Sequence, residues 1–168
     1  MKWNEYLRES ARFENKELTE GDLMDNAIFG LFGELGELCD LFKKVWFHGH
    51  PEDRDHILKE CGDVLWYYLA LYCRHQDCGH FCTESRCLYG SPKAPMIFVM
   101  KNTSELVFGD SDMEQMNAMS VYADIAAVAN FYDSTIEEVM DMNLAKLSAR
   151  YPDGFSTEKS LHRKEGDI

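Results

Sequence analysis

Apolar residues spaced three and four positions apart constrain this chain more than any other feature. One series runs from Met24 to Val45 and a second from Ile57 to Tyr72. This spacing aligns apolar side chains along one side of an α-helix. The segment between the two series, residues 48–51, contains glycine and proline and is typical of a helix break. The sequence therefore predicts two long antiparallel helices that form a hairpin.

Weaker signals add further helices to this hairpin. Apolar residues from Tyr122 to Ala129 indicate a third core helix. Ser134 and Glu137 have the spacing of a capping box, which predicts the start of a fourth helix that ends near residues 151–154. Residues 3–13 suggest a short additional helix. We expect an all-α fold: one antiparallel bundle of four to five helices over residues 1–168, with a mobile tail after about residue 157.

The pattern changes between the second and third core helices. Several glycines and prolines lie between Asp77 and Glu114, and we interpret residues 72–120 as an irregular insertion. Within it, residues 96–100 and 105–108 are expected to pair as a small β-hairpin.

Charge and hydropathy exclude several classes of function. The chain has 30 acidic and 17 basic residues and a formal net charge of -13, which disfavours nucleic acid and anionic membranes as partners. The amino terminus has no apolar central segment, and the apolar run from Val64 to Cys73 is too short to span a bilayer. We expect a cytoplasmic protein whose 6 cysteines are reduced thiols.

The two long helices carry the same short acidic pattern. Glu34 and Glu37 lie on the first helix, and Glu60 and Asp63 lie on the second, each pair enclosing a glycine. Residues three apart share one side of a helix, so each helix presents two carboxylates together. An antiparallel hairpin can bring both pairs to one place. Four carboxylates in a groove would repel one another unless a cation lay between them.

All-oxygen ligation is what hard divalent ions such as Mg²⁺ prefer. Magnesium keeps coordination positions for water and for phosphate oxygens, so phosphate chemistry is the expected use of this site. Gly36 and Gly62 support this interpretation, because glycine inside a helix costs about 1 kcal/mol relative to alanine. Close approach of the backbone to a ligand would explain them. The alternative is a solvated acidic face with glycines that permit tight helix packing.

A polar set on the last helix adds to this picture. Asn143, Lys146 and Arg150 share one side of that helix, with Asn143 at the edge of its apolar stripe. An amide beside a lysine and an arginine is suited to phosphate oxygens or a sugar hydroxyl. The alternative is an amphipathic helix with basic residues near its carboxyl end, which the helix dipole favours.

With these segments lined up, the chain resembles the MazG-like, all-alpha nucleoside triphosphate pyrophosphohydrolases. The signature of that family is ExxE followed by ExxD, which Glu34, Glu37, Glu60 and Asp63 match. Residues 30–37, 43–49, 60–67 and 143–152 also resemble the family. The likeness covers roughly residues 20–71 and 121–155 and leaves out the expected insertion.

The resemblance implies a hydrolase that converts (d)NTP to (d)NMP and pyrophosphate and works as a homodimer or homotetramer. It implies that the four acids bind Mg²⁺, with Mn²⁺ as a substitute, and form the catalytic centre. The residues expected to contact the nucleotide are Lys44, His48, Asn143, Lys146, Arg150 and Tyr151. The preferred base and sugar stay open, as does the carboxylate that orients the attacking water.

Two other classes of protein stay open at this point. A carboxylate di-iron bundle gathers acids between helices, but it uses Glu-x-x-His pairs, and Asp63 stands where histidine would be needed. A non-catalytic, metal-stabilised interaction module would instead use cysteine and histidine ligands for zinc. The candidates for those ligands are Cys73, His75, Cys78, His80, Cys82 and Cys87.

Three aromatic residues near the acidic segments allow two interpretations. Trp46, Trp66 and Tyr67 either stack on a nucleotide base or belong to the core.

Overall fold

The computed structural model describes residues 2–73, 90–109 and 114–162. Its elements are α1 (Trp3–Ser10), a short 3₁₀ turn (Ala11–Phe13), α2 (Glu20–His48), α3 (Arg54–Tyr72), α4 (Lys93–Phe108), α5 (Glu114–Phe131), α6 (Ile136–Arg150) and α7 (Thr157–Leu161). The described residues contain no strand. The prediction of an all-α helical bundle is confirmed.

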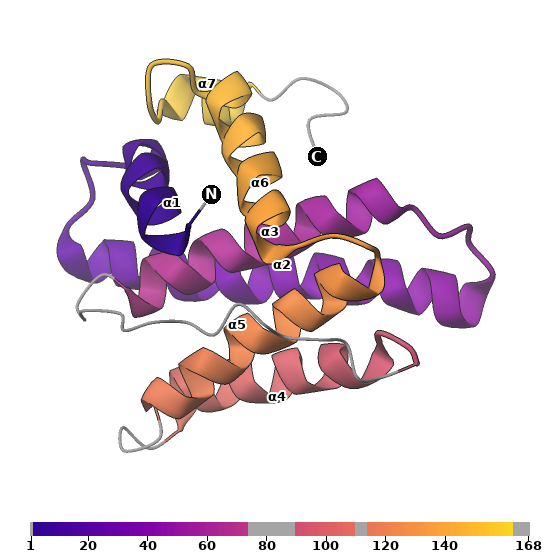
Figure 1. Ribbon diagram of the computed structural model, residues 1–168. Helices are drawn as coiled ribbons and strands as arrows, with labels where there is room; N and C mark the ends of the chain where they lie inside the picture. The colour runs from indigo at the N-terminus through magenta and orange to yellow at the C-terminus, as the bar shows by residue number, and fades with distance from the viewer. Residues whose placement is uncertain (1, 74–89, 110–113, 163–168) are drawn as a thin grey trace.

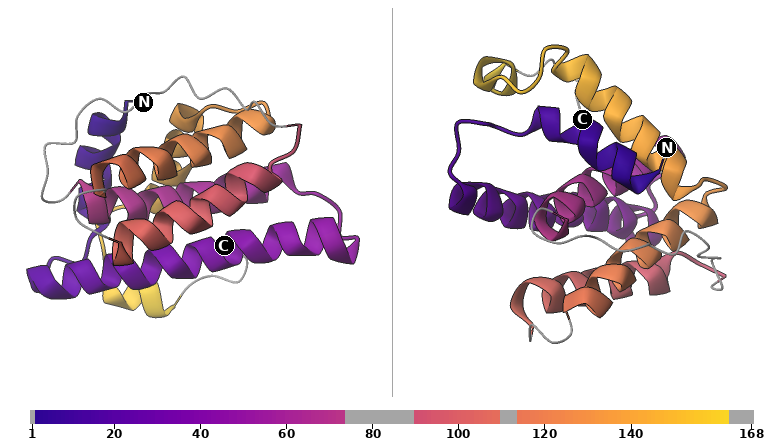
Figure 2. Two further views of the ribbon diagram at one scale, coloured as in Figure 1. Left: turned by 90° about the horizontal axis from the view of Figure 1, so that it is seen from below. Right: turned by 60° about the vertical axis from the view of Figure 1, so that its left-hand side comes forward.

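The helices form three layers, with the α2–α3 hairpin in the middle (Figure 1). Helices α1 and α6 lie on one side of this hairpin, and α4 and α5 pack against each other on the opposite side, as the right-hand view of Figure 2 shows. α6 crosses α3, whose apolar and acidic residues are therefore enclosed between layers.

The α2–α3 hairpin follows from the predicted stripes and from its caps. Thr19 forms a capping box with Asp22 at the start of α2, and Gly49, with φ of 73°, ends that helix. A positive φ favours glycine at that position, which explains why the helix ends here. Asp53 caps α3 by accepting a hydrogen bond from the backbone N–H of His56 at 3.1 Å. These local signals make the hairpin the best predicted part of the fold.

The segment from Lys93 to Phe108 is helical, so the β-hairpin expected there is wrong. The buried side chains of α4 include Met96, Val99 and Thr103, which lie three and four positions apart and face the core. Pro95 lies in the first turn, where proline is tolerated because the missing N–H would have no helical partner. The expected irregular insertion is thus helical over these residues and over the first part of α5, residues 114–120, whereas the rest of α5 contains the predicted third core helix.

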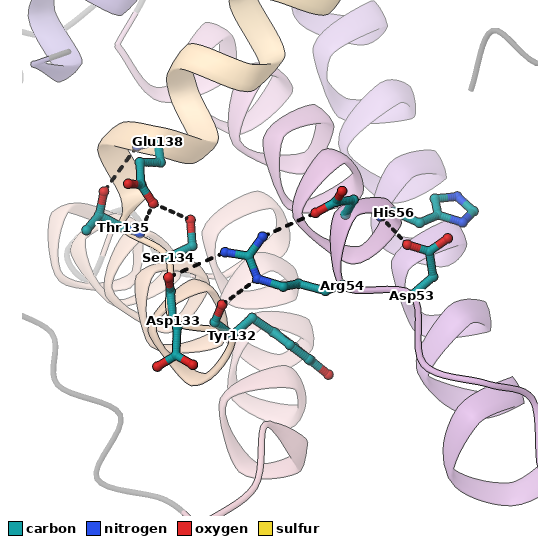
Figure 3. A network of polar contacts seen from close by, with 9 residues as sticks. Asp53, Arg54, His56, Tyr132, Asp133, Ser134, Thr135 and Glu138 are labelled. Atoms are coloured by element: carbon teal, nitrogen blue, oxygen red, sulfur yellow. Dashed lines mark hydrogen bonds and ion pairs between the residues drawn. The ribbon is translucent and has the colours of Figure 1, made fainter.

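The turn between α5 and α6 is fixed to the start of α3. Arg54 donates from Nε to the carbonyl oxygen of Tyr132 at 2.7 Å and from a terminal nitrogen to that of Asp133 at 3.4 Å. Figure 3 shows the guanidinium group of Arg54 lying against this turn. Thr135 and Glu138 then form the capping box of α6, one position later than predicted. These contacts fix where α6 begins relative to α3.

One smaller expectation is also corrected, and another stays a prediction. Thr157–Leu161 forms α7, which Ser156 caps by accepting from the N–H of Lys159. The mobility expected of the tail after about residue 157 stays a prediction. Cys73 is disulfide-bonded, so the expectation of six reduced thiols is wrong for this residue, whereas Cys39 and Cys61 are free. Among the described residues, no helix combines the length and apolar character needed to span a membrane.

Candidate active site

Three carboxylates from the two central helices converge. Glu34 and Glu37 of α2 and Glu60 of α3 each offer one oxygen, and these oxygens lie within 4.8 Å of one another. The side chains line a cavity of about 530 Å³ together with Asp63. The helical period explains the convergence, because residues three apart on each helix point the same way and the hairpin brings the two acidic segments side by side.

The electrostatics of this cluster favour a bound cation. Burial and the neighbouring carboxylates, Asp63 first among them, raise the pKa of Glu34 to about 7 and that of Glu60 to about 7. Glu60 is 1% exposed, and its Oε2 is buried without a hydrogen-bond partner, while Oε1 lies 3.2 Å from Nε2 of His56. A divalent ion would relieve the repulsion and satisfy that oxygen, so the residues present fit a hard metal ion.

Asp63 has different partners from the other three acids. Asn143 donates from Nδ2 to Oδ1 of Asp63 at 2.8 Å, and Lys146 donates from Nζ to Oδ2 at 2.5 Å. Both partners belong to α6, so Asp63 joins the α2–α3 hairpin to the helix that crosses it. Lys146 thereby holds a positive charge at the cavity wall, directly beside the carboxylate cluster.

Asn143 is not among the residues that line the cavity, and the expectation that it contacts the nucleotide stays a prediction. Its side chain is 1% exposed and is bonded at both ends, because Tyr6 of α1 donates its hydroxyl to Oδ1 at 2.6 Å. Burial and the charge of Asp63 raise the pKa of Tyr6 well above its ordinary value, which keeps the hydroxyl protonated. Tyr6 and Asn143 are 137 positions apart, so no local sequence pattern could have linked them.

The two glycines inside the acidic segments have different surroundings. A Cβ atom at Gly62 would lie 2.9 Å from Cβ of Asn143, so Gly62 allows α6 to approach α3 closely enough for Asn143 to reach Asp63. A Cβ atom at Gly36 would meet nothing within 4 Å. Close packing therefore explains Gly62 but not Gly36.

The rest of the cavity combines aromatic, amide and cationic side chains. Trp66 and Tyr67 of α3 line it, together with Arg150 and Tyr151 from the end of α6. Further lining residues that the sequence reasoning missed are Phe13, Asn15, Asn26 and Phe155. They come from the segment before α2, from the first turns of α2 and from the segment before α7, which carry no periodic signal of a site. Trp46 stacks instead on Phe42.

A second, more open groove of about 390 Å³ is also bordered by the acids. Glu37 and Glu60 line both hollows, and Lys44 and His56 line only this groove. Lys44 is paired with Asp40 at 2.7 Å. His48 is exposed and lines neither hollow, so the structure separates it from the acids. Of the six residues expected to contact nucleotide, Lys146, Arg150 and Tyr151 line the main cavity.

The structure gives little support to the zinc and di-iron alternatives. Disulfide bonding of Cys73 removes that sulfur from the expected zinc ligands. His75, Cys78, His80, Cys82 and Cys87 lie outside the described residues. His56 contacts Glu60 but is not among the residues whose ligand atoms converge.

Comparison with known proteins identifies the family and corrects the sequence-based resemblance. No curated protein and no solved structure matched the chain. A family model described as dUTPase matches residues 2–146, including the segment interpreted as an insertion. The resemblance to MazG-like enzymes is therefore wrong: it depended on four short blocks, whereas the dUTPase model matches most of the chain. The chain belongs to the dUTPase family of nucleotide pyrophosphatases, hydrolases of nucleotide phosphoanhydride bonds.

Proposed function

We propose that this protein hydrolyses dUTP to dUMP and pyrophosphate with Mg²⁺ held by Glu34, Glu37, Glu60 and Asp63. The observation that carries the proposal is the convergence of three of these carboxylates within 4.8 Å. The cavity that they line is also lined by lysine, arginine and aromatic side chains. Membership of the dUTPase family supports dUTP as the substrate.

The residues of the cavity divide by the part of the substrate they suit. Lys146 and Arg150 supply positive charge for phosphate oxygens, and guanidinium geometry suits phosphate in particular. Trp66 and Tyr67 offer aromatic surface to a base. The amides of Asn15 and Asn26 supply both donors and acceptors, which the edge of a uracil ring requires.

In the proposed reaction, a water oxygen bonds to the α-phosphorus as the bond from that phosphorus to the bridging oxygen breaks. Pyrophosphate leaves, and the proton of the water passes to a carboxylate of the cluster. A divalent ion held by the acids would neutralise phosphate charge and lower the pKa of water. Lys146 and Arg150 stabilise the charge that develops on the leaving phosphates.

The test is hydrolysis of each of the eight common triphosphates with Mg²⁺ in H₂¹⁸O. We expect pyrophosphate release to be fastest with dUTP and the label to appear in dUMP, since attack is at the α-phosphorus. Glu37→Gln should abolish release while the helical circular dichroism signal survives. Glu105→Gln, which changes a partly exposed acid on α4 in the same way, should leave the rate unchanged. Label in pyrophosphate, or full activity of Glu37→Gln, would refute the proposal.

A further inference from the structure

A buried chain of hydrogen bonds leads from α1 to the acidic cluster. Tyr6 donates to Oδ1 of Asn143 at 2.6 Å, and Asn143 donates from Nδ2 to Oδ1 of Asp63 at 2.8 Å. The exposed fractions of Tyr6, Asn143 and Asp63 are 0%, 1% and 7%. Three helices, α1, α6 and α3, therefore meet through side chains that have almost no access to water.

The direction of these hydrogen bonds follows from which groups can donate and which can only accept. An ionised Asp63 only accepts hydrogen bonds, so the amide of Asn143 must turn its NH₂ group toward it. That orientation leaves Oδ1 facing Tyr6, which must then donate. Without the hydroxyl, Oδ1 would be a buried acceptor with no partner, and nothing at that end would oppose rotation of the amide.

The close approach of α3 limits the space around Asn143. A Cβ atom added to Gly62 would stand only 2.9 Å from Cβ and 3.4 Å from Nδ2 of Asn143. The NH₂ group therefore lies beside the backbone of α3 and donates to Asp63, while the hydroxyl of Tyr6 holds the opposite end of the amide.

We propose that Tyr6 is a positioning residue of the active site, which orients Asp63 through Asn143 for binding of the divalent ion and the nucleotide. This inference rests on the proposed function, because it assigns Asp63 to the metal and phosphate site. Tyr6 itself lines neither hollow and acts only through its neighbour. Partners that orient metal ligands in this way are worth about 10- to 100-fold in metal affinity or activity.

The test compares Tyr6→Phe with a matched variant that loses the same group elsewhere. Tyr68 is also fully buried, and it donates its hydroxyl to the carbonyl oxygen of Ala118 at 2.5 Å, away from the acids. Both variants should melt at a lower temperature than the wild type. Only Tyr6→Phe should weaken Mn²⁺ binding, measured by paramagnetic resonance of the free ion, by about 10-fold or more. Tyr68→Phe should bind Mn²⁺ within about twofold of the wild type.

Two further measurements separate positioning from general destabilisation. In a double-mutant cycle, Tyr6→Phe should change Mn²⁺ affinity by less than about twofold once Asn143 is replaced by leucine, since its route to Asp63 is gone. The side-chain NH₂ resonances of Asn143 in metal-free protein should shift or broaden in Tyr6→Phe and not in Tyr68→Phe. Should Tyr6→Phe fail to fold, 3-fluorotyrosine at position 6 keeps the hydroxyl and should still shift those resonances.

Each result decides the matter. Wild-type affinity in Tyr6→Phe, or unmoved Asn143 resonances in that variant or in the fluorinated protein, would overturn the positioning role and leave the proposed function standing. Failure of the wild-type protein to bind Mn²⁺ would instead overturn the proposed function, and this inference with it.

Discussion

Gly62 of α3 and Asn143 of α6 are in such close contact that a Cβ atom at Gly62 would stand 2.9 Å from Cβ of Asn143. Gly62→Ala should therefore push α6 outward by a few tenths of an ångström and lengthen the hydrogen bond from Asn143 to Asp63. We expect a loss of about 1–3 kcal/mol in the free energy of unfolding and a lower kcat. Urea unfolding and steady-state hydrolysis of dUTP measure the two effects.

Gly36→Ala is the matched control for that substitution. Gly36 has the same place in the first acidic segment, but an added Cβ would meet nothing within 4 Å. Alanine should stabilise α2 by about 0.5–1 kcal/mol through its higher helix propensity. Equal effects at the two positions would mean that contact with α6 is not the reason for Gly62.

The stability of the metal-free protein should fall as pH rises from about 4.5 to 7. Burial and neighbouring carboxylates raise the pKa of Glu34 and Glu60 to about 7, from an ordinary value of 4.5. The folded protein thus binds protons more tightly than the unfolded chain, and that stabilisation is lost as pH rises through the folded pKa. Melting temperatures in a chelator should drop over this range, and Mg²⁺ should restore most stability above pH 7. Glu60→Gln should flatten the slope; an unchanged slope would contradict the assignment.

Asp124 should destabilise the fold at neutral pH. Burial raises its pKa to about 6, although the hydrogen bond from Asn102 at 2.8 Å acts in the opposite direction. Its contribution to stability is therefore present at low pH and lost as pH rises through about 6. Asp124→Asn keeps an acceptor for Asn102 and should raise the urea midpoint at pH 8 more than at pH 5. Glu17→Gln, an exposed change of equal charge, should not show this difference in a parallel titration.

Lys146→Met should reduce activity strongly without unfolding the protein. The ammonium group of Lys146 pairs with Asp63 at the cavity wall. It is one of the groups proposed to stabilise phosphate charge. Loss of one such donor typically costs about 100-fold in kcat. Lys101→Met removes an exposed lysine paired with Glu105 at 2.9 Å and should change neither kcat nor stability measurably. Equal activity of the two variants would exclude Lys146 from the reaction.

The local parts of the fold were predictable because their causes lie close together in the sequence. Leu31, Leu35 and Leu38 are buried at the spacing that predicted α2, and Gly49 ends that helix where the break was expected. The pairing of the acidic segments follows from the same periodicity and from the short connection. The β-hairpin was wrong because the glycines and prolines of this segment were interpreted as helix breaks, although Pro95 lies in the first turn of α4, where proline is tolerated.

The remainder of the site depends on contacts between distant residues. The burial of Asn143 requires the crossing of α6 over α3, which no residue pattern encodes by itself. Asn15 and Asn26 reach the cavity only because the segment before α2 and the start of α2 border it. The family assignment failed for a related reason, since four short blocks carry less information than a match extending over residues 2–146.

The hydrogen bonds from Arg54 to the carbonyl groups of Tyr132 and Asp133 offer a way to change the shape of the cavity without altering its lining. They anchor the beginning of α6, whereas Arg150 and Tyr151, at the other end of that helix, form part of the cavity wall. If α6 rotated about its fixed first turn, its last turn would be displaced the most. Substitution of Arg54 would therefore change the width of the cavity while every residue that lines it stays the same.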